Sequence, residues 1–389
     1  MDTIATRFES IARNSPDSIA VQDHQRSISY RELLRRAHAL SARLTQGERR
    51  GSEPVLICLP HSVEMIVAVV AVLLSNKFFI GADPNTPPKR LEALCRISGT
   101  SLIVVNTSSA GTIHCFGGTA SIVNMETAIS NAAQPIHCLD ELAPASLQFT
   151  SGTTGEPKAV ARRHRDFLRR VDFETDSENL SSTDSFCLMY RVGFSAASND
   201  VFLALLNGAT LQIYDFELYG VAGISSWILD RQITRLHLPV EVYRQWLDSL
   251  SEGDFFPCIK QIIPSGKQMV RDYQNAWRYL SADCTFVSRY ASTETGMVSR
   301  HVISRQNQPS EDPVPVGYPL EESNIRVLDE NLCPLKDGDI GEIMISGHNF
   351  TGRYWDTATF SSALDRRDYD NPAPASHMTG DFGYFNDQG

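Results

Sequence analysis

Short apolar runs alternate with helical patterns along most of the chain. Apolar runs at 55–59, 78–82 and 101–106 are separated by helical spacing at 62–74 and 87–97. The same arrangement returns with the runs at 209–215, 233–239, 259–265 and 284–290. Continuous apolar runs of this length, separated by helices, are typical of buried parallel strands. The sequence therefore predicts an α/β fold with largely parallel sheets.

The pattern changes near the C-terminal end of the chain. "SNIRVLD" (323–329) and "GEIMISG" (341–347) alternate apolar and polar residues and are flanked by turn-forming stretches. Such alternation predicts strands with one exposed face, as in a small antiparallel sheet or β-barrel. We therefore expect two α/β subdomains over about residues 1–310 and a β-rich subdomain over about 311–389.

Polar clusters follow four of the predicted strands. They span Thr150–Lys158, Pro239–Glu241, Ser265–Lys267 and Arg289–Glu294. Ligands of parallel α/β sheets bind beyond the carboxyl ends of the strands. The four clusters therefore predict one shared cleft, and the alternative is that they are ordinary polar loops.

The first cluster, within "LQFTSGTTGEPKAV" (147–160), has the composition of an anion-binding loop. Backbone N–H groups of glycine-rich turns form concave anion sites, which hydroxyl groups and a lysine reinforce. The loop does not match the Walker pattern, because its glycines are too close together and Ala159 follows Lys158. It does not match the G-x-S-x-G nucleophile motif either, because Ser151 precedes the first glycine. A phosphate-bearing ligand is the expectation.

Composition narrows the class of protein. The 389 residues carry a net charge of −11, which argues against a general nucleic-acid or anionic-membrane binder. The eight cysteines are widely spaced, a pattern that indicates neither a zinc site nor a disulfide framework. The start of the chain is not a signal peptide, and the ten-residue apolar run from Met65 is too short for a membrane span. We expect a cytoplasmic protein with no membrane and no nucleic-acid partner.

Several motifs together resemble the adenylate-forming superfamily, which comprises acyl- and aryl-CoA ligases, luciferases and adenylation domains of nonribosomal peptide synthetases. "FTSGTTGEPKAV" is similar to the phosphate loop of that superfamily, and "RYASTETG" (289–296) to its "YGxTE" motif. "ISYRELLRRAHALSARL" (28–44), "GADPNTPPKRLEAL" (81–94), "GEIMISGHNFTGRYW" (341–355) and "TGDFGYFNDQG" (379–389) match further motifs in family order. The resemblance covers nearly the whole chain and is greatest to the large N-terminal part of peptide-synthetase adenylation domains.

The resemblance implies a role for each matched residue. The ATP phosphates would be bound by Thr150, Ser151, Gly152, Thr153, Thr154 and Gly155, with Lys158 holding the loop or the departing phosphates. Tyr290 would stack on adenine, Gly266 would border it, and Asp381 would bind both ribose hydroxyls. Thr293 would contact the α-phosphate, and Glu294 would help to bind Mg²⁺, which prefers carboxylate oxygen.

The implied chemistry is ATP-dependent activation of a carboxylic acid as acyl-AMP, with release of pyrophosphate. A phosphopantetheine thiol on a carrier protein, or within other synthetase modules, would then receive the acyl group. An acyl- or aryl-CoA ligase and a nucleotide-binding pseudoenzyme or scaffold are the alternatives.

The acid-binding positions depart from the pattern of amino-acid activators. "FSAASNDVFLALLNGATL" (194–211) resembles the helix in which those enzymes place an aspartate after the phenylalanine to bind the α-ammonium group. Here Ser195 follows Phe194, and a neutral hydroxyl cannot neutralise an ammonium ion. The other matched positions are Asn199, Glu241, Arg289 and Met297. Glu241 and Arg289 would pair with each other, face solvent, or meet opposite charges on the substrate. We expect a small polar acid, including non-standard amino acids, rather than a long fatty chain.

The chain stops where the hinge and small C-terminal domain of the family would begin. That domain normally supplies a catalytic lysine for adenylation. The resemblance therefore implies a large subdomain without its small partner, and slow adenylation by this fragment alone.

Overall fold

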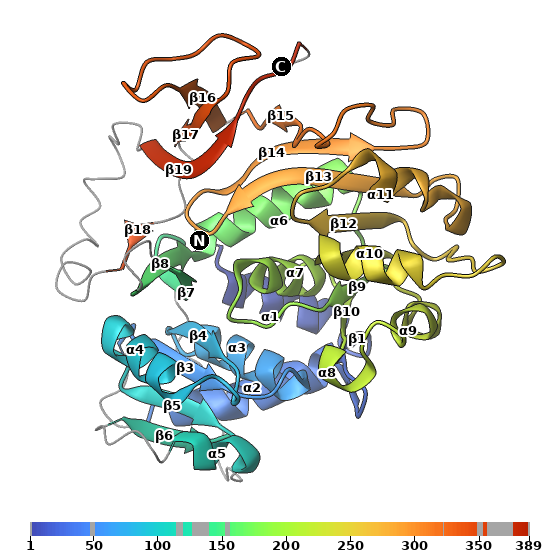
Figure 1. Cartoon of the computed structure of the whole chain (residues 1–389). Coiled ribbons are helices and arrows are strands. Elements are labelled where there is room, and N and C mark those ends of the chain that lie inside the picture. The colour runs from blue at the N-terminus through green and yellow to red at the C-terminus, as the bar shows by residue number, and fades with distance from the viewer. Residues whose placement is uncertain are drawn as a thin grey trace. The chain divides into compact units, whose positions relative to one another are not determined.

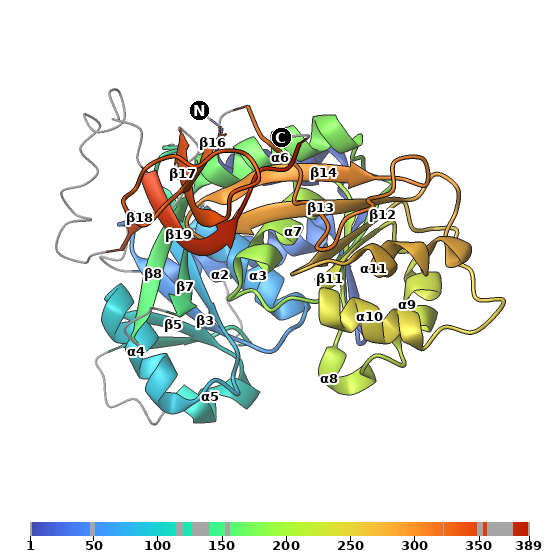
Figure 2. The same ribbon diagram turned by 45° about the horizontal axis from the view of Figure 1, so that its top comes forward.

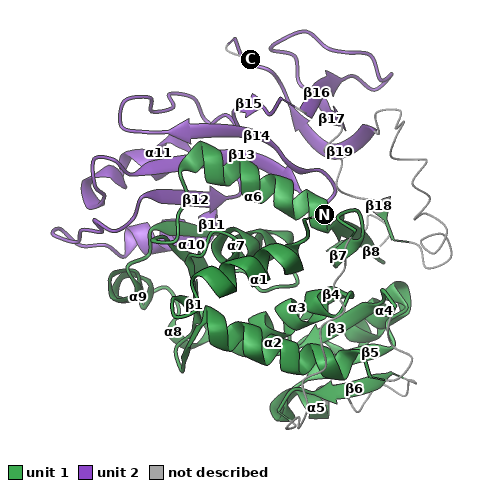
Figure 3. Ribbon diagram, turned by 180° about the vertical axis from the view of Figure 1, so that it is seen from behind, with its two compact units in different colours: residues 1–238, 353–361 green, residues 239–352, 362–389 purple. Residues whose placement is uncertain are grey.

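The computed structural model describes residues 2–46, 51–113, 120–126, 140–151, 156–321, 323–347, 353–355 and 376–387. The chain divides into two compact units, coloured separately in Figure 3. Unit 1 comprises residues 1–238 and 353–361, and unit 2 comprises residues 239–352 and 362–389. Figure 1 labels the helices and strands in chain order.

Unit 1 contains a series of helices and two sets of strands. Its helices are α1 (Ile4–Asn14), α2 (Tyr30–Leu44), α3 (Val63–Leu74), α4 (Pro88–Ser98), α5 (Thr107–Ile113), α6 (His164–Glu178), α7 (Ser195–Leu205), α8 (Phe216–Tyr219) and α9 (Ile224–Arg231). Its strands are β1 (Ile19–Gln22), β2 (Ser27–Ser29), β3 (Pro54–Cys58), β4 (Phe78–Ala82), β5 (Leu102–Val105), β6 (Ser121–Asn124), β7 (Pro144–Ser151), β8 (Pro157–Arg163), β9 (Ser185–Leu188), β10 (Thr210–Ile213), β11 (Arg235–Pro239) and β18 (Arg353–Tyr354).

The strands of unit 1 are mainly parallel, as the apolar runs predict. One sheet has the order β18-β8-β7-β4-β3-β5-β6, in which β7, β4, β3, β5 and β6 run parallel. The other set has the order β11-β9-β10-β1-β2, and only β2 is antiparallel to its neighbour. The exceptions in the first sheet are β8 and β18, each antiparallel to the strand beside it (Figure 2).

Helix α3 forms the centre of the unit 1 core. Every residue of α3 except Glu64 is buried, and the helix packs with residues of β3, β9 and β10 in one apolar cluster. This helix contains the apolar run from Met65, which explains its hydrophobicity as burial on all sides. Among the described helices, none is both long and apolar enough to cross a membrane.

The other face of the β3–β4 sheet is covered by α4. Leu91 and Leu94 of α4 pack against Leu56 and Ile80, whose side chains point away from α3. Both faces of these strands are therefore buried, which is why their sequences are continuous apolar runs rather than alternating ones.

The described part of unit 2 contains three helical elements and a set of mixed strands. Its helices are α10 (Val240–Asp248), α11 (Val270–Gln274) and the short 3₁₀ helix Trp277–Tyr279. Its strands are β12 (Gln261–Ser265), β13 (Thr285–Ser292), β14 (Gly296–Ile303), β15 (Tyr318–Pro319), β16 (Ser323–Leu328), β17 (Gly341–Gly347) and β19 (Ser376–Gly383). β12 and β13 are parallel, whereas β14 and β15 extend this group in antiparallel fashion.

The β-rich part of unit 2 is an open antiparallel sheet. It has the order β16-β17-β19, with β17 antiparallel to both neighbours. The alternating sequence left open a sheet or a barrel, and the described strands form a three-stranded sheet rather than a closed barrel.

Candidate active site

Strands β7 and β8 form a hairpin with one polar and one apolar face. Because alternate residues of a strand share a face, the register places five polar side chains together: Ser146, Gln148, Thr150, Lys158 and Arg162. Leu147 and Ala161, which lie out of phase with them, pack in the apolar cluster with α4. We call the first set of side chains the polar face of the hairpin.

The hairpin carries the predicted phosphate loop between its strands. β7 ends at Ser151 and β8 begins at Pro157, and these two residues are register partners. The interior of the loop, from Gly152 to Gly155, and the side chain of Ser151 lie outside the described residues. The structure therefore defines where the loop begins and ends, and the contacts expected of its interior stay a prediction.

Lys158 lies at the loop end of β8. It is the register partner of Thr150, and both residues are half-buried. The Lys158 ammonium nitrogen lies 5.0 Å from the centre of the Tyr354 ring on β18, a distance typical of a cation–π contact. This contact holds the lysine beside the loop.

The first two turns of α7 and its N-cap carry the expected acid-binding residues of unit 1. Phe194 is the N-cap residue and is 63% exposed, Ser195 is half-buried, and Asn199 is 8% exposed. A close backbone contact positions this turn. A Cβ atom on Gly81 of β4 would lie 2.7 Å from the backbone nitrogen of Gly193, so both glycines are needed where these segments meet.

Arg162 extends from the polar face of the hairpin to Ser195. Its side chain is fully buried, and its Nη1 donates a hydrogen bond to the Ser195 Oγ at 3.1 Å. The guanidinium carbon also lies 4.6 Å from the centre of the Phe167 ring. Burial lowers the pKa of Arg162 to about 10, so the side chain stays protonated near pH 7. The structure thus places a positive charge directly behind Ser195.

Sequence reasoning missed Arg162 and its neighbour Gln148. Arg162 stands in the basic run "ARRHR", which has the composition of an exposed charged stretch. The sequence did hold one indication of its position, which is the two-residue period of a strand. Because of this period, Lys158, Val160 and Arg162 must share one face of β8. Gln148 is the β7 residue of the same face, and its Nε2 donates to the Ser198 Oγ of α7 at 3.2 Å.

In unit 2, two distant motifs meet at one hydrogen bond. The Tyr290 hydroxyl on β13 donates to the Asp381 carboxylate on β19, 91 residues further along the chain. Burial, together with the Asp381 contact, raises the pKa of Tyr290. The resemblance assigned both residues to nucleoside binding, and the structure brings these two together.

A bulge in β19 presents Asp381. Met378 pairs with Met344 and Phe382 pairs with Glu342, so three residues of β19 oppose only Ile343. Within this bulge Gly380 has φ +75°, a backbone conformation that favours glycine. The bulge therefore gives a structural reason for the "TGD" motif. It directs the exposed Asp381 carboxylate away from the hydrogen-bonded pairing of β17 and β19.

Thr293 and Glu294 lie in the turn that joins β13 to β14. Both are half-buried, and the neighbouring Thr295 N–H donates to the Ser292 Oγ at 3.1 Å. Met297, on the next strand, is buried and is the register partner of Ala291. A shift in the β13–β14 register occurs between Tyr290 and Ala291, next to this turn. The irregular ladder is typical of strands beside a functional site.

The remaining predicted residues of unit 2 lie at strand and helix ends. Gly266 follows β12 with φ +122°, and a Cβ atom there would lie 2.8 Å from Val240 at the start of α10. Glu241 is exposed on the first turn of α10, and Arg289 is half-buried on β13. β12 and β13 are adjacent and parallel, so Gly266 and Arg289 belong to the same edge of the strands.

No preformed metal cluster accompanies these residues in the part of the chain that the structure describes. No group of three or more His, Cys, Asp or Glu side chains converges there. None of the described cysteines forms a disulfide bond. The binding of Mg²⁺ at Glu294 stays a prediction.

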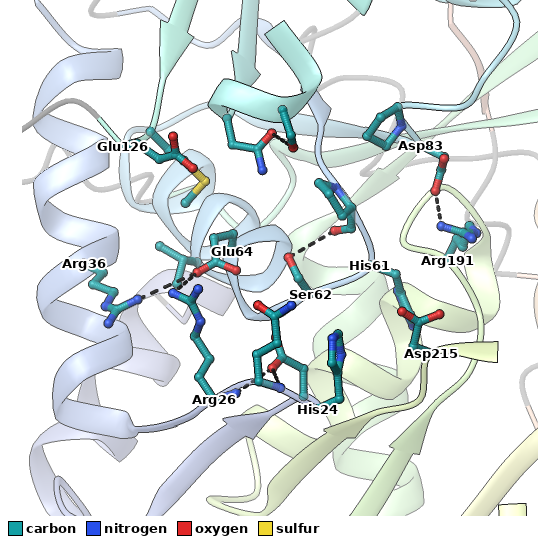
Figure 4. Close-up of a pocket in the computed structure, with 18 of the residues that line it drawn as sticks. His24, Arg26, Arg36, His61, Ser62, Glu64, Asp83, Glu126, Arg191 and Asp215 are labelled. Atoms are coloured by element: carbon teal, nitrogen blue, oxygen red, sulfur yellow. Dashed lines mark hydrogen bonds and ion pairs between the residues drawn. The ribbon is translucent and has the colours of Figure 1, made fainter. Parts of the chain in front are cut away.

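A polar cavity of about 950 Å³ lies elsewhere in unit 1. Figure 4 shows Arg26 and Arg36 directed at Glu64, and Arg191 directed at Asp83. The Arg26–Glu64 ion pair measures 2.6 Å and the Arg36–Glu64 pair 3.9 Å. These charged side chains of the cavity wall therefore pair with one another.

Comparison with known sequences establishes the class of protein. The sequence model of the family described as AMP-binding enzyme matches residues 8–355. The chain therefore belongs to the AMP-binding enzyme family, and the expectation of an adenylate-forming ligase is confirmed at that level.

Relatives of the chain are peptide synthetases. It is 26% identical to tyrocidine synthase 1 of Brevibacillus parabrevis over 381 residues, which are 96% of this chain and 34% of that protein. It is also 26% identical to syringomycin synthase SyrB1 of Pseudomonas syringae pv. syringae over 351 residues, which are 87% of this chain and 56% of that protein. The chain thus spans only part of these relatives.

Solved structures share the fold. The N-terminal subdomain of NpsA from Klebsiella oxytoca, in complex with 3-hydroxybenzoyl-AMSN, superposes with a TM-score of 0.78 at 23% identity and covers 100% of this chain and 98% of that one. The nonribosomal peptide synthetase FmoA3 superposes with a TM-score of 0.86 at 19% identity, covering 99% of this chain and 41% of that one. The predicted α/β fold with a small antiparallel sheet is confirmed.

Proposed function

We propose that this protein uses ATP to activate a small polar carboxylic acid as acyl-AMP. A carboxylate oxygen of the acid attacks the α-phosphorus of ATP, and the bond from that phosphorus to the bridging oxygen breaks. Pyrophosphate leaves with the bonding electrons. The protein contributes orientation and charge neutralisation rather than covalent chemistry.

The observation that carries the proposal is the hydrogen bond between Tyr290 and Asp381. It joins two motifs for which the family resemblance implies nucleoside binding. In the proposed complex the Tyr290 ring stacks on adenine, and the Asp381 carboxylate accepts hydrogen bonds from the ribose hydroxyls. Gly266 borders the adenine, where the absence of a side chain leaves room for the base.

We assign the ATP phosphates to polar groups of the phosphate loop and of the "RYASTETG" motif. The loop from Thr150 to Gly155 and Lys158 bind the β- and γ-phosphates, and Thr293 contacts the α-phosphate. Glu294 would supply a carboxylate ligand to Mg²⁺, and the bound ion would neutralise phosphate charge. The half-buried position of Lys158 against Tyr354 supports this assignment, because partial burial strengthens its attraction for phosphate.

Buried polar atoms near α7 support the proposal that the substrate is a polar acid. Within the described residues, Gln148 Oε1, Arg162 Nε and Asn199 Oδ1 are buried without a hydrogen-bond partner. A long apolar acyl chain against them would leave these groups unsatisfied, at about 1–3 kcal/mol each. We assign the acid to Phe194, Ser195 and Asn199, together with Glu241, Arg289 and Met297.

We assign the thiol of a carrier-protein phosphopantetheine arm as the acceptor of the acyl group. A solved structure with a similar fold is described as NpsA–ThdA, an artificially fused adenylation–PCP di-domain from Klebsiella oxytoca. The pairing of an adenylation domain with a PCP in that structure (TM-score 0.81, 22% identity, covering 100% of this chain) is the reason for assigning a carrier protein rather than free coenzyme A.

Replacing Asp381 with alanine tests the nucleotide assignment. We expect AMP to bind about 10–100-fold more weakly, since hydrogen bonds to a charged group contribute roughly 1.5–3 kcal/mol. Isothermal titration with AMP measures the change. Asp283→Ala, at an exposed aspartate in the turn before β13, is the matched control and should bind AMP like the wild type. Wild-type affinity in the Asp381→Ala variant would remove Asp381 from the site.

A further inference from the structure

The environment of Ser195 has a definite electrostatic sign. Arg162, 1% exposed, donates from Nη1 to the Ser195 Oγ at 3.1 Å. Among the described residues, no carboxylate lies within ion-pair distance of this guanidinium. The half-buried Asp166 of α6 accepts a hydrogen bond from the Arg163 N–H at 2.9 Å, and its carboxylate interacts electrostatically with the Arg162 guanidinium from beyond ion-pair distance. The group in direct contact with the Ser195 hydroxyl is therefore the positively charged guanidinium of Arg162.

The hydrogen-bond direction at Ser195 follows from the chemistry of arginine. A guanidinium group only donates, so the Ser195 oxygen accepts from Arg162. The single Ser195 O–H is then left to donate, and within the described part of the chain it makes no further hydrogen bond. Ser195 is also the first residue of α7, an 11-residue helix, so the positive end of the helix dipole lies at the same place.

These features favour a hydrogen-bond acceptor, rather than a cation, as the substrate group that contacts Ser195. An ammonium group brings only donors and a positive charge, and both conflict with a donating hydroxyl backed by a guanidinium. A carbonyl oxygen brings lone pairs and partial negative charge, and it would accept a hydrogen bond from the Ser195 O–H.

We propose that Ser195, held and polarised by Arg162, binds a carbonyl oxygen next to the carboxyl group of the substrate, so that the protein activates 2-oxo acids and discriminates against 2-amino acids. This inference rests on the proposed function, which places Ser195 beside the acid. Ser195 is the binding residue and Arg162 is a positioning residue that acts through it.

Binding of non-reacting adenylate analogues tests this selectivity without turnover. The probes are two acyl-sulfamoyl adenosines with the same carbon chain, one bearing a 2-oxo group and the other a 2-amino group. Adenosine 5′-sulfamate, which lacks an acyl group, reports adenylate binding alone. Isothermal titration on the wild type should show the 2-oxo analogue binding about 30-fold more tightly than the 2-amino analogue.

Two variants locate the origin of the preference. Arg162→Met removes the charge but keeps much of the buried volume, and Ser195→Ala removes the hydroxyl at a half-buried position with little risk to folding. Each should reduce the ratio of the two affinities to within about threefold, and thermal unfolding verifies that each variant is folded. The ratio cancels any general loss of adenylate affinity, which a purely structural role of Arg162 would produce.

Each outcome decides the inference. If the wild type binds the 2-amino analogue as tightly as the 2-oxo analogue, the inference is wrong and the proposed function stands. If the 2-oxo preference exists but survives in Ser195→Ala, these residues do not produce it. If adenosine 5′-sulfamate itself does not bind, the proposed function fails and the inference fails with it.

Discussion

Replacing Gly152 and Gly155 together with valine should weaken ATP binding by more than about 100-fold. Both glycines stand in the loop whose ends are set by the pairing of Thr150 with Lys158 on the β7–β8 hairpin. In an anion nest the backbone N–H groups approach the phosphates closely, and branched side chains block that approach. The loss of two charge-assisted hydrogen bonds, at roughly 1.5–3 kcal/mol each, accounts for the size of the effect. Isothermal titration with ATP is the measurement.

Gly51→Val is the matched control for this double variant. A Cβ atom at Gly51 would meet nothing within 4 Å, so the substitution adds the same side chain without a local clash. We expect its ATP affinity to equal that of the wild type. Undiminished ATP binding in the Gly152/Gly155 variant would show that the loop does not hold the phosphates.

Replacing Arg235 with methionine should lower the free energy of unfolding by about 3–5 kcal/mol. Arg235 on β11 forms ion pairs with Glu174 and Glu178 of α6, and all three side chains are at most 4% exposed. Removing the arginine leaves two carboxylates buried with less compensation, which is more costly than the loss of an exposed pair. Urea-induced unfolding followed by tryptophan fluorescence gives the change.

Arg31→Met is the control for the loss of an ion pair. Arg31 pairs with Asp17 at 3.0 Å, but the two side chains are 64% and 84% exposed, so water screens their attraction. We expect a change of at most about 1 kcal/mol. If Arg235→Met is no more destabilising than Arg31→Met, the buried ion pairs do not stabilise the fold in the way that their burial indicates.

Elements with one strong sequence signal could be predicted closely. The apolar run at 78–82 coincides with β4, and the helical pattern from Ser62 to Leu74 matches α3, for which Ser62 is the N-cap residue. In these segments nearly every residue is apolar and buried, so the pattern has one interpretation. The antiparallel direction of β8 was not predicted, because strand direction depends on pairing partners that local periodicity does not encode.

Residues of the candidate site could be predicted only where they belong to a sequence motif that resembles one of the family. Tyr290 and Asp381 were matched through "RYASTETG" and "TGDFGYFNDQG", and the structure joins them by a hydrogen bond. Arg162 belongs to no such motif, and its burial depends on the packing of α7 over the polar face of the hairpin. A charged residue in a basic run gives no sign of burial, so its contact with Ser195 required the three-dimensional structure.

Exchange of labelled pyrophosphate into ATP, measured with a panel of small polar carboxylic acids, tests the central claim most directly. The reversal of acyl-AMP formation carries the label into ATP only when the acid, ATP and Mg²⁺ react together. The proposed function predicts acid-dependent exchange above the acid-free background with at least one member of the panel, and no exchange with long-chain fatty acids. ATP binding without acid-dependent exchange for any member would contradict the claim and indicate a nucleotide-binding protein that does not activate acids.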